Sequence, residues 1–372
     1  MQPDPFTVSR YPGLEAFVPT IPAQRRLRVC LATEEIVGPI DNGGIASTYF
    51  DLARLLEELG HDVTVLYLKG EVCHNETIEH WVNYYADLGI TFVPLPASED
   101  EYESVAPLWQ ERLYNAWNWL RDQQTFDLVH TSEWRGGTNY ALLAKRQGLA
   151  FQDTLFIVKT SSPYRWNRHY QMRFFDNVQM LGVMYPEQMT VELSDMTVGG
   201  SAHLLSFMEY MGYSLPAGRT FVQPNVILFD RLNVEDKRPH YETGDIVETD
   251  ELVFFGRLEQ RKGLEIFCDA LDFAIARGCK PSKISFLGKE GTRIPSYPEY
   301  KTKAFIALRA ESWPCEVVIH DDFNQHAAIS YMLKQPCIAV MPSLIENSTM
   351  EVYEALVYRI PFIATRVGGT PE

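Results

Sequence analysis

The chain has 372 residues, of which 46% are hydrophobic, so it is long enough to form two domains with sizeable cores. Its formal net charge of −16 argues against a general nucleic-acid-binding protein, because contacts to phosphates need clustered cations. No apolar run approaches the roughly 18 residues of a membrane helix, and the first residues lack the apolar core of a signal peptide. The six cysteines show no paired pattern, which favours free thiols and a cytoplasmic location.

The first half of the chain opens with a predicted strand–helix–strand unit. The strands are expected at 27–32 and 63–68, and the helix between them at about 46–59. Gly43 and Gly44 lie in the loop before this helix, where glycine lets the backbone approach a phosphate at a helix N-terminus. The loop lacks the G-x-G-x-x-G spacing of dinucleotide-binding enzymes. A tight turn without a ligand is therefore the alternative interpretation.

The alternation of strands and helices continues to about residue 225, as is typical of a parallel sheet. Predicted strands cover 91–95, 126–130, 155–159 and 221–225, and predicted helices cover 107–121 and the segment capped by Ser201. The strand at 126–130 ends in His130, followed by Thr131, Ser132, Glu133 and Trp134. His130 is either a core residue at a strand end or a side chain that contacts a ligand.

Basic and aromatic residues interleave just after the strand at 155–159, in a chain that is otherwise acidic. The residues are Tyr164, Arg165, Trp166, Arg168, His169, Tyr170, Arg173 and Phe174. Such a cluster can bind an anionic acceptor or lipid head groups at the inner face of a membrane. The simpler interpretation is an amphipathic helix with arginines on its exposed face.

Residues 230–250 are charged and poor in large aliphatic side chains, which predicts a linker between two domains. A strand at 251–255 follows, and then the sequence GRLEQRKG ahead of a helix at 264–278. Arg257 and Lys262 lie on this strand-to-helix loop, where two cations can neutralise a diphosphate. Taken alone, they are better explained as a solvated pair of basic residues. Further strands are predicted at 283–287, 316–320 and 337–341, with helices before residue 316 and at 325–333.

The last predicted unit is a strand, a loop, a helix and a second strand. Ser348 and Glu351 have the spacing of a capping box, which predicts that the helix begins near Thr349. The helix ends by Arg359, because Pro361 cannot continue it, and a strand follows at 362–365. The loop before the helix lies at the carboxyl end of a parallel strand, where open α/β sheets bind ligands.

Two carboxylates lie in this unit, Glu346 in the loop and Glu354 in the helix. At about 100° per residue, Glu354 falls about 40° from Met350 and borders the apolar face of the helix. An acid in that position is seldom buried without a partner. The alternatives are a half-exposed glutamate for Glu354 and an ordinary loop acid for Glu346.

The string PS-x-x-E-x7-E-A, continued by IP-F-IAT-x-VGG, resembles the signature of family-4 retaining glycosyltransferases of the GT-B fold. GRL-x-x-x-KG resembles the pyrophosphate motif of the same family, and the glycine loop with G-H-x-V resembles its first glycine-rich loop. The resemblance implies two Rossmann-like α/β domains with parallel sheets that face a cleft. The acceptor-side domain would span 1–230 and the nucleotide-sugar-binding domain 231–372.

The resemblance also implies roles for single residues. Arg257 and Lys262 would hold the diphosphate, Glu346 would lie by the donor sugar, and Glu354 would bind the ribose. Gly43 and Gly44 would approach the donor phosphate or the acceptor.

The family reads H-x-H-[DE]-W at the end of the strand at 126–130. His130 matches the first histidine, so the catalytic set would comprise His130, Arg257, Lys262 and Glu346. Ser132 stands in place of the second histidine. No convincing D-x-D cluster is present, and Asp321 and Asp322 read as turn residues, so no metal and no cofactor are expected.

The implied function is transfer of a sugar, with retention, from a nucleotide-diphosphate sugar to a glycan, lipid or small-molecule acceptor, as in polysaccharide biosynthesis. The alternatives are another GT-B enzyme, such as a nucleotide-sugar epimerase or a glycan phosphorylase, and a non-catalytic module that binds nucleotide-sugars or glycans. The chain stops inside the family signature, so the resemblance implies an incomplete second domain. We expect a longer chain to be more soluble and more active.

Overall fold

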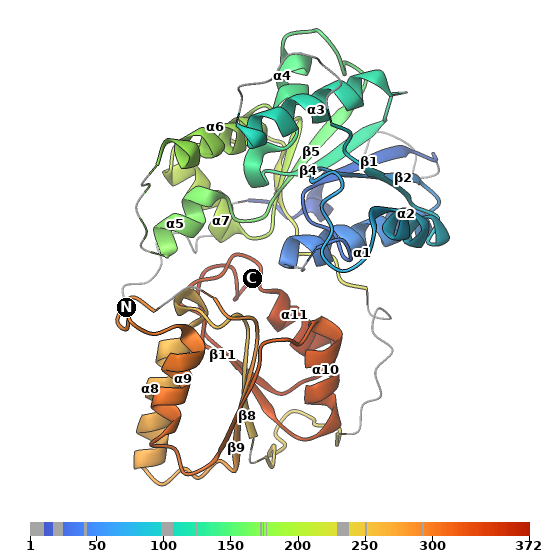
Figure 1. Cartoon of the computed structure of the whole chain (residues 1–372). Coiled ribbons are helices and arrows are strands. Elements are labelled where there is room, and N and C mark those ends of the chain that lie inside the picture. Colours follow the sequence, from blue (N-terminus) through green and yellow to red (C-terminus); the bar gives the residue numbers. More distant parts are fainter. Residues whose placement is uncertain are drawn as a thin grey trace. The chain divides into compact units, whose positions relative to one another are not determined.

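The computed structural model describes residues 11–17, 25–40, 43–97, 107–123, 125–171, 173, 175, 177–228, 238–249, 251–291 and 294–372 (Figure 1). The chain divides into two compact units, residues 1–228 and residues 229–371. Within the described ranges, none of the helices combines the length and the apolar character needed to cross a membrane.

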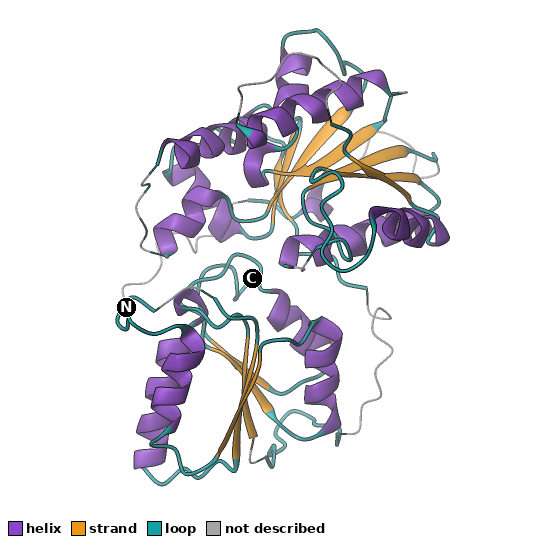
Figure 2. Ribbon diagram, viewed as in Figure 1, coloured by secondary structure: helices purple, strands orange, loops and turns teal. Residues whose placement is uncertain are grey.

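The first unit is built on a seven-stranded sheet in which all pairs of neighbouring strands are parallel. The strands lie in the order β3-β2-β1-β4-β5-β6-β7. Their bounds are β1 Arg28–Thr33, β2 Asp62–Tyr67, β3 Thr91–Pro94, β4 Leu128–Ser132, β5 Leu155–Thr160, β6 Met196–Gly199 and β7 Thr220–Val222. The central strand β1 is buried from its second residue to its last, because helices cover both faces of the sheet (Figure 2).

The helices of the first unit follow the strands in the alternation expected of a parallel sheet. They are α1 Gly44–Glu58, α2 Ile78–Asp87, α3 Leu108–Asp122, α4 Asn139–Arg146, α5 Tyr164–Tyr170, α6 Val178–Glu192 and α7 Ala202–Tyr210, with a short 3-10 turn, η2, at Trp134–Gly136. Tyr49 of α1 and Tyr85 of α2 are fully buried in one core cluster with residues of β1 to β3. Ser201 caps α7 as predicted, since its hydroxyl accepts a hydrogen bond of 3.1 Å from the backbone N–H of Leu204.

Three helices of the first unit were not predicted from the sequence: α2, α4 and α6. The longest, α6, contains Gly182 and Pro186, residues that ordinarily argue against a helix interior. Apolar side chains also occupy opposite sides of α6, because Val183 is buried whereas Val178 is exposed. The pattern of apolar residues therefore has no single face that would reveal the helix.

The second unit holds a five-stranded parallel sheet in the order β10-β9-β8-β11-β12. The strands are β8 Glu251–Phe255, β9 Lys283–Leu287, β10 Glu316–His320, β11 Ile338–Met341 and β12 Phe362–Ala364. The helices are α8 Leu264–Ala276, α9 Thr302–Ala310, α10 Gln325–Lys334 and α11 Met350–Val357, and the 3-10 turn η3 spans Gln260–Lys262. Helices α8 and α9 cover one face of this sheet, and α10 and α11 cover the other (Figure 2).

Two Rossmann-like domains with parallel sheets, as predicted, are therefore the architecture of this chain. Part of the predicted linker, 230–237 and residue 250, lies outside the described residues. The described part, 238–249, contains no helix or strand.

Candidate functional site

The loop from β8 to α8 places Arg257 and Lys262 at the carboxyl edge of the second sheet. Arg257 follows the last residues of β8 and is exposed, while Lys262 ends η3 and is buried. Gly256, the residue before Arg257, has a φ of +147°, and a Cβ there would lie 3.6 Å from Cδ of Lys262. The lysine side chain thus turns back over the start of the loop.

Lys262 meets the second predicted motif directly. Its Nζ lies 2.8 Å from Oε1 of Glu346 and 2.8 Å from Oε1 of Glu351. Arg261 reaches the same carboxylate, with Nη1 3.0 Å from Oε2 of Glu346, and the hydroxyl of Ser343 donates to Oε1 at 2.8 Å. Both oxygens of Glu346 are therefore occupied by cations of the β8–α8 loop and by a hydroxyl of its own loop.

This network fixes the charge states of its members. Burial alone would raise the pKa of Glu346, but Lys262 and Arg261 hold it well below the usual range of a glutamate. Burial lowers the pKa of Lys262, yet the carboxylates of Glu346 and Glu351 outweigh it and raise this pKa above its usual value. The pair is therefore ionised at neutral pH.

The predicted capping box of Ser348 and Glu351 is not present at the start of α11. The helix does begin next to Thr349, which is the N-cap of α11, but no side chain of the described chain caps it. Glu351 pairs with Lys262 instead of returning to the N-cap, and the hydroxyl of Ser348 hydrogen-bonds that of Tyr353 at 2.8 Å. The ion pair is preferred to a hydrogen bond with the backbone because Lys262 is buried and its charge needs a charged partner.

Glu354, on α11, is also buried, and its hydrogen-bond partner is not one of the residues that contact Glu346. Gln325, the first residue of α10, donates a side-chain hydrogen bond to its carboxylate. The interpretation of Glu354 as a half-exposed surface glutamate is therefore wrong, since only 6% of the residue is exposed.

Two glycines allow the segment around Glu346 to lie close to its neighbours. Gly263 has a φ of +78°, and a Cβ there would lie 1.9 Å from the carbonyl oxygen of Pro342. Gly368 has a φ of +53°, and its Cβ would lie 2.1 Å from the carbonyl oxygen of Glu346. Only glycine fits these contacts, so GRLEQRKG and VGG both serve to pack the loop that carries Glu346.

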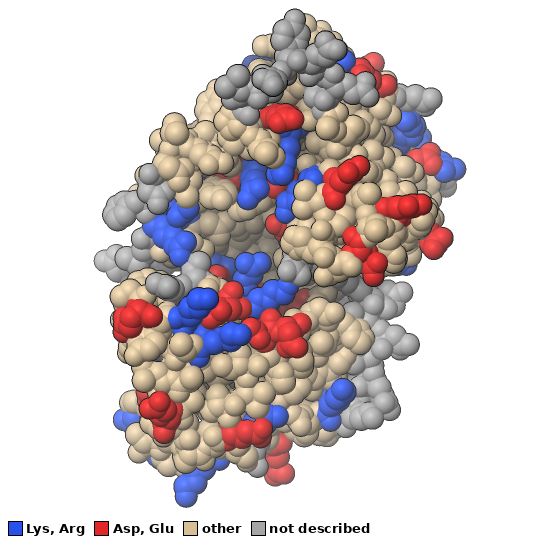
Figure 3. All heavy atoms as spheres, in the orientation of Figure 1, with Lys and Arg blue, Asp and Glu red and all other residues tan. Residues whose placement is uncertain are grey.

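The network contains two cations, Arg261 and Lys262. Its three carboxylates are those of Glu346, Glu351 and Glu259, and the last lies 3.1 Å from Arg261. The charges of Lys262 and Arg261 are thus already compensated within the protein. Arg257 differs, since it is exposed and pairs with no acid in the described part of the chain. Figure 3 shows basic and acidic side chains intermixed at this edge of the second unit.

Sequence reasoning missed Arg261, Ser343 and Glu351 as members of this site. Arg261 adjoins Lys262 in GRLEQRKG, and Ser343 belongs to the PS pair that begins the second motif. Their positions in the motifs were a signal that could have identified them. Glu351 gave no such signal, because its spacing from Ser348 favoured a cap.

The remaining predicted residues lie in the first unit. Gly43 is the N-cap of α1, with extended backbone angles, and Gly44 is the first residue of the helix. His130 is half-buried on β4, its ring 5.5 Å from that of Tyr49 in an edge-on contact. Burial, aided by the charge of Lys159, lowers the pKa of His130 to about 3, so the ring is neutral at pH 7. The catalytic role of His130 stays a prediction.

A second buried network lies where β4 and β5 end. Glu133 is fully buried and accepts hydrogen bonds from the backbone N–H of Ser161 at 2.7 Å and the hydroxyl of Ser132 at 3.0 Å. Burial raises the pKa of Glu133 to about 7. Lys159 is buried nearby, and desolvation lowers its pKa to about 7 despite the carboxylate of Glu133. Ser132 is therefore held by Glu133 and by Ser161, whose hydroxyl lies 3.0 Å from that of Ser132.

Glu187 of α6 hydrogen-bonds both the segment after β4 and the segment after β5. Its carboxylate, fully buried, accepts from the backbone N–H of Arg135 and of Tyr164, each at 2.9 Å. Burial raises the pKa of Glu187 well above its usual value. Arg135 and Ser162 have left-handed φ angles of 57° and 90°, an arrangement that needs such support from its surroundings.

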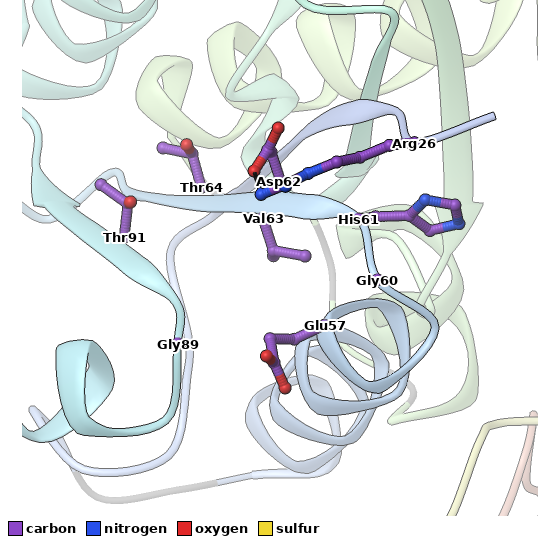
Figure 4. A pocket seen from close by; sticks show the side chains of 9 residues that line it. All are labelled: Arg26, Glu57, Gly60, His61, Asp62, Val63, Thr64, Gly89 and Thr91. Carbon is purple, nitrogen blue, oxygen red and sulfur yellow. Dashed lines mark hydrogen bonds and ion pairs between the residues drawn. The ribbon is translucent and has the colours of Figure 1, made fainter.

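A cavity of about 230 Å³ lies elsewhere, at the amino ends of β2 and β3 (Figure 4). It is lined by Arg26, Glu57, Gly60, His61, Asp62, Val63, Thr64, Gly89 and Thr91. Arg26 and Asp62 pair with each other across an exposed part of its rim. Ligands of open α/β sheets bind at the opposite, carboxyl edge, so we assign no function to this cavity. No group of three or more metal-ligating side chains occurs among the residues that the structure describes.

Solved structures of other proteins share the fold of this chain over most of its length. The catalytic domain of starch synthase IV from Arabidopsis thaliana, bound to ADP and acarbose, is 12% identical with a TM-score of 0.63, covering 93% of this chain and 84% of that one. Anabaena HepE with UDP and glucose is 14% identical with a TM-score of 0.54 (93% and 82% covered). A UDP-forming α,α-trehalose-phosphate synthase from Burkholderia vietnamiensis is 12% identical with a TM-score of 0.53 (93% and 85%).

The fold is therefore that of the GT-B class. At these identities the likeness establishes the fold alone. The sequence of residues 249–372 matches the profile of the family described as Glycosyl transferases group 1. The second unit thus carries a glycosyl transferases group 1 domain, and it contains all of the network around Glu346. No curated protein sequence matches the chain.

Proposed function

We propose that this chain is a retaining glycosyltransferase that uses a nucleotide-diphosphate sugar as donor. The observation that carries the proposal is the contact between Lys262 and Glu346, Nζ to Oε1 at 2.8 Å. It joins the two motifs of the domain at the carboxyl edge of the second sheet, where ligands of such folds bind.

In this proposal the cations of the β8–α8 loop bind the diphosphate. Arg257 is exposed and offers a planar guanidinium with five donors, and Lys262 contributes a fixed positive charge. Both would stabilise the negative charge that develops on the leaving diphosphate as the bond to the sugar breaks. Side chains of the protein, rather than a tightly held metal, would supply this charge.

Glu346 and Glu354 have separate roles in the proposal. Glu346, kept ionised by Lys262 and Arg261, lies by the donor sugar, where its charge can orient hydroxyl groups. Glu354, held by Gln325, binds the ribose of the nucleotide. A carboxylate accepts hydrogen bonds from both hydroxyls of a ribose, which suits this task.

The first unit provides the acceptor side. Gly43 and Gly44 at the N-terminus of α1 would approach the acceptor or the donor phosphate. His130, neutral at pH 7, is able to accept or donate a hydrogen bond to a sugar hydroxyl. The acceptor is a glycan, a lipid or a small molecule, as in the synthesis of polysaccharides in the cytoplasm.

The test is incubation of the purified chain with UDP-, GDP- and ADP-sugars and a panel of acceptors, without added metal and in the presence of a chelator. Transfer of labelled sugar to an acceptor, lost in Lys262→Met and kept in Lys280→Met, supports the proposal. Lys280 is an exposed lysine just before β9, at the amino edge of the same sheet.

Other products would identify the alternatives. An epimerised nucleotide-sugar, or phosphorolysis of a glycan, would assign a different reaction to the same fold. Tight binding of a nucleotide-sugar with neither transfer nor hydrolysis would indicate a non-catalytic module. Each of these results would overturn the proposed transfer.

A further inference from the structure

The first turns of α6 expose apolar side chains on their outer face. Val178 is 84% exposed, Leu181 54% and Tyr185 67%. At about 100° per residue these three side chains fall within an arc of about 60° on the helix. They therefore form one stripe, which we call the α6 stripe. Phe175, 39% exposed, precedes it in the chain.

The stripe is confined to the first half of the helix. Gln188 and Glu192 continue the same face toward the C-terminus, where the amide of Gln188 donates to the carboxylate of Glu192 at 2.7 Å. The opposite face of α6 is buried through Val183, Glu187 and Val191. The exposed apolar residues are thus not a by-product of an apolar helix, because the rest of the outer face is polar.

Arginines precede the α6 stripe in the chain, on α5 and in the connection that follows it. The guanidinium of Arg168, on α5, reaches the sulfur of Met180 in the first turn of α6, at 3.0 Å. Arg173 is exposed between the two helices, and its backbone N–H donates to the carbonyl oxygen of Arg168. Arg165 is half-buried on α5, where its Nη1 donates to the carbonyl oxygen of Met211.

The local charge opposes that of the whole chain. Between Pro163 and Pro186 the sequence holds three arginines and a single acid, Asp176, whereas the chain as a whole carries a net charge of −16. An acidic protein would be repelled by an anionic surface except where such a basic segment faces it. Figure 1 shows α5 and α6 as neighbouring helices of the first unit.

We infer that the α6 stripe and the three arginines that precede it, Arg165, Arg168 and Arg173, form a docking surface for an anionic lipid membrane. Apolar side chains on one face of a helix insert at the boundary between head groups and acyl chains, and adjacent arginines bind the anionic head groups. Tyr185 suits this position, since a tyrosine has an apolar ring and a polar hydroxyl. The membrane would be contacted, not crossed, and the surface does not depend on which reaction the second unit carries out.

The test is sedimentation of the full chain with phosphatidylcholine vesicles, prepared with and without phosphatidylglycerol, at low and high salt. We expect binding only to the vesicles that contain phosphatidylglycerol, and less of it at high salt. Replacing Arg165, Arg168 and Arg173 together by glutamine should weaken binding at least about tenfold, since each basic residue near such a surface contributes roughly fivefold.

A second variant tests the apolar part. Val178→Ser, Leu181→Ser and Tyr185→Ser, combined, should also weaken vesicle binding at least about tenfold. The matched control is Leu149→Ser with Ile246→Ser, two apolar residues that are 72% and 84% exposed elsewhere. This control should bind vesicles like the unchanged chain.

Three results would overturn the inference. They are absence of binding to anionic vesicles at low salt, binding that neither triple variant weakens, and a change from oligomer to monomer in the serine variant without a change in lipid binding. The last result would show that the stripe joins two copies of the chain. Vesicle binding requires no donor or acceptor, so its failure is distinct from failure of the proposed transfer.

Discussion

The side-chain nitrogen of Lys262 lies 2.8 Å from a carboxylate oxygen of Glu346, although the two residues belong to loops that follow different strands of the second sheet, β8 and β11. The same nitrogen lies 2.8 Å from Glu351. A diphosphate that binds here must therefore compete with carboxylates of the protein for the lysine. This competition determines whether a substitution in the site should raise or lower the affinity for the diphosphate.

Loss of either loop cation should weaken binding of the donor. Arg257→Ala and Lys262→Ala each remove a charge-assisted contact of roughly 1.5–3 kcal/mol, so the affinity for the nucleotide-sugar should fall at least about tenfold. Calorimetric titration measures the change, with Lys280→Ala as the control. Unchanged affinity in both variants would show that the loop does not bind the diphosphate.

Removal of the competing acid should act in the opposite direction. Glu351→Gln leaves Lys262 with one carboxylate fewer, so the affinity for a nucleoside diphosphate should rise by about twofold to fivefold. The effect is small because Glu351 is one-fifth exposed, and water screens its charge. Weaker binding in this variant would mean that Glu351 instead positions the lysine for the ligand.

Gly263 should tolerate no side chain. In Gly263→Ala the new Cβ would meet the carbonyl oxygen of Pro342, so the loop that carries Glu346 must move, and stability should fall by about 3 kcal/mol or more. The control is Gly278→Ala, whose φ of +94° is also left-handed but whose Cβ would meet nothing within 4 Å. It should cost only about 1 kcal/mol. Equal loss in the two variants, measured by urea denaturation, would contradict the steric argument.

The buried Glu133 should make the first unit less stable as the pH rises. Its folded pKa of about 7 exceeds the ordinary 4.5, so its contribution to stability is complete below about pH 4.5 and is lost as the pH rises through 7. Glu133→Gln should reduce the fall in the free energy of unfolding between these pH values by about 1–3 kcal/mol. Glu187 acts in the same direction and remains in the variant.

Tryptophan fluorescence during urea denaturation is a suitable measurement, because six of the seven tryptophans precede residue 228. Asp153→Asn, at an exposed acid of the same unit, is the control and should leave the pH profile unchanged. A profile that is identical in Glu133→Gln would show that Glu133 is not protonated on folding.

The stereochemistry of transfer tests the roles of Glu346 and Glu354. If both act as proposed, NMR of the first-formed product should show that the anomeric configuration of the donor is retained. Glu346→Gln should lower the rate of transfer more than the affinity for the donor, because its charge would matter most as the sugar reacts. An inverted product would show that the resemblance to retaining enzymes misleads about mechanism.

The sequence by itself determined the strands of both sheets except β6, and part of the main site, from which Arg261, Ser343 and Glu351 were missing. Buried strands such as 251–255 and 283–287 are short apolar runs bounded by turn residues, and the structure has them with the predicted bounds. Arg257, Lys262, Glu346 and Glu354 were identified because each lies in a motif with fixed spacing. These features depend on neighbours within about ten residues, which a sequence displays directly.

Only the tertiary structure decided which partner each charge has. The spacing of Ser348 and Glu351 predicted a cap, but Glu351 pairs with Lys262, which another strand brings to it. The sequence also did not predict the burial of Glu133, Lys159 and Glu187, or the helix α6 that contains Glu187. The alignment of parallel strands places their carboxyl ends side by side, and the free energy of burying a charge then depends on side chains that are distant in the chain.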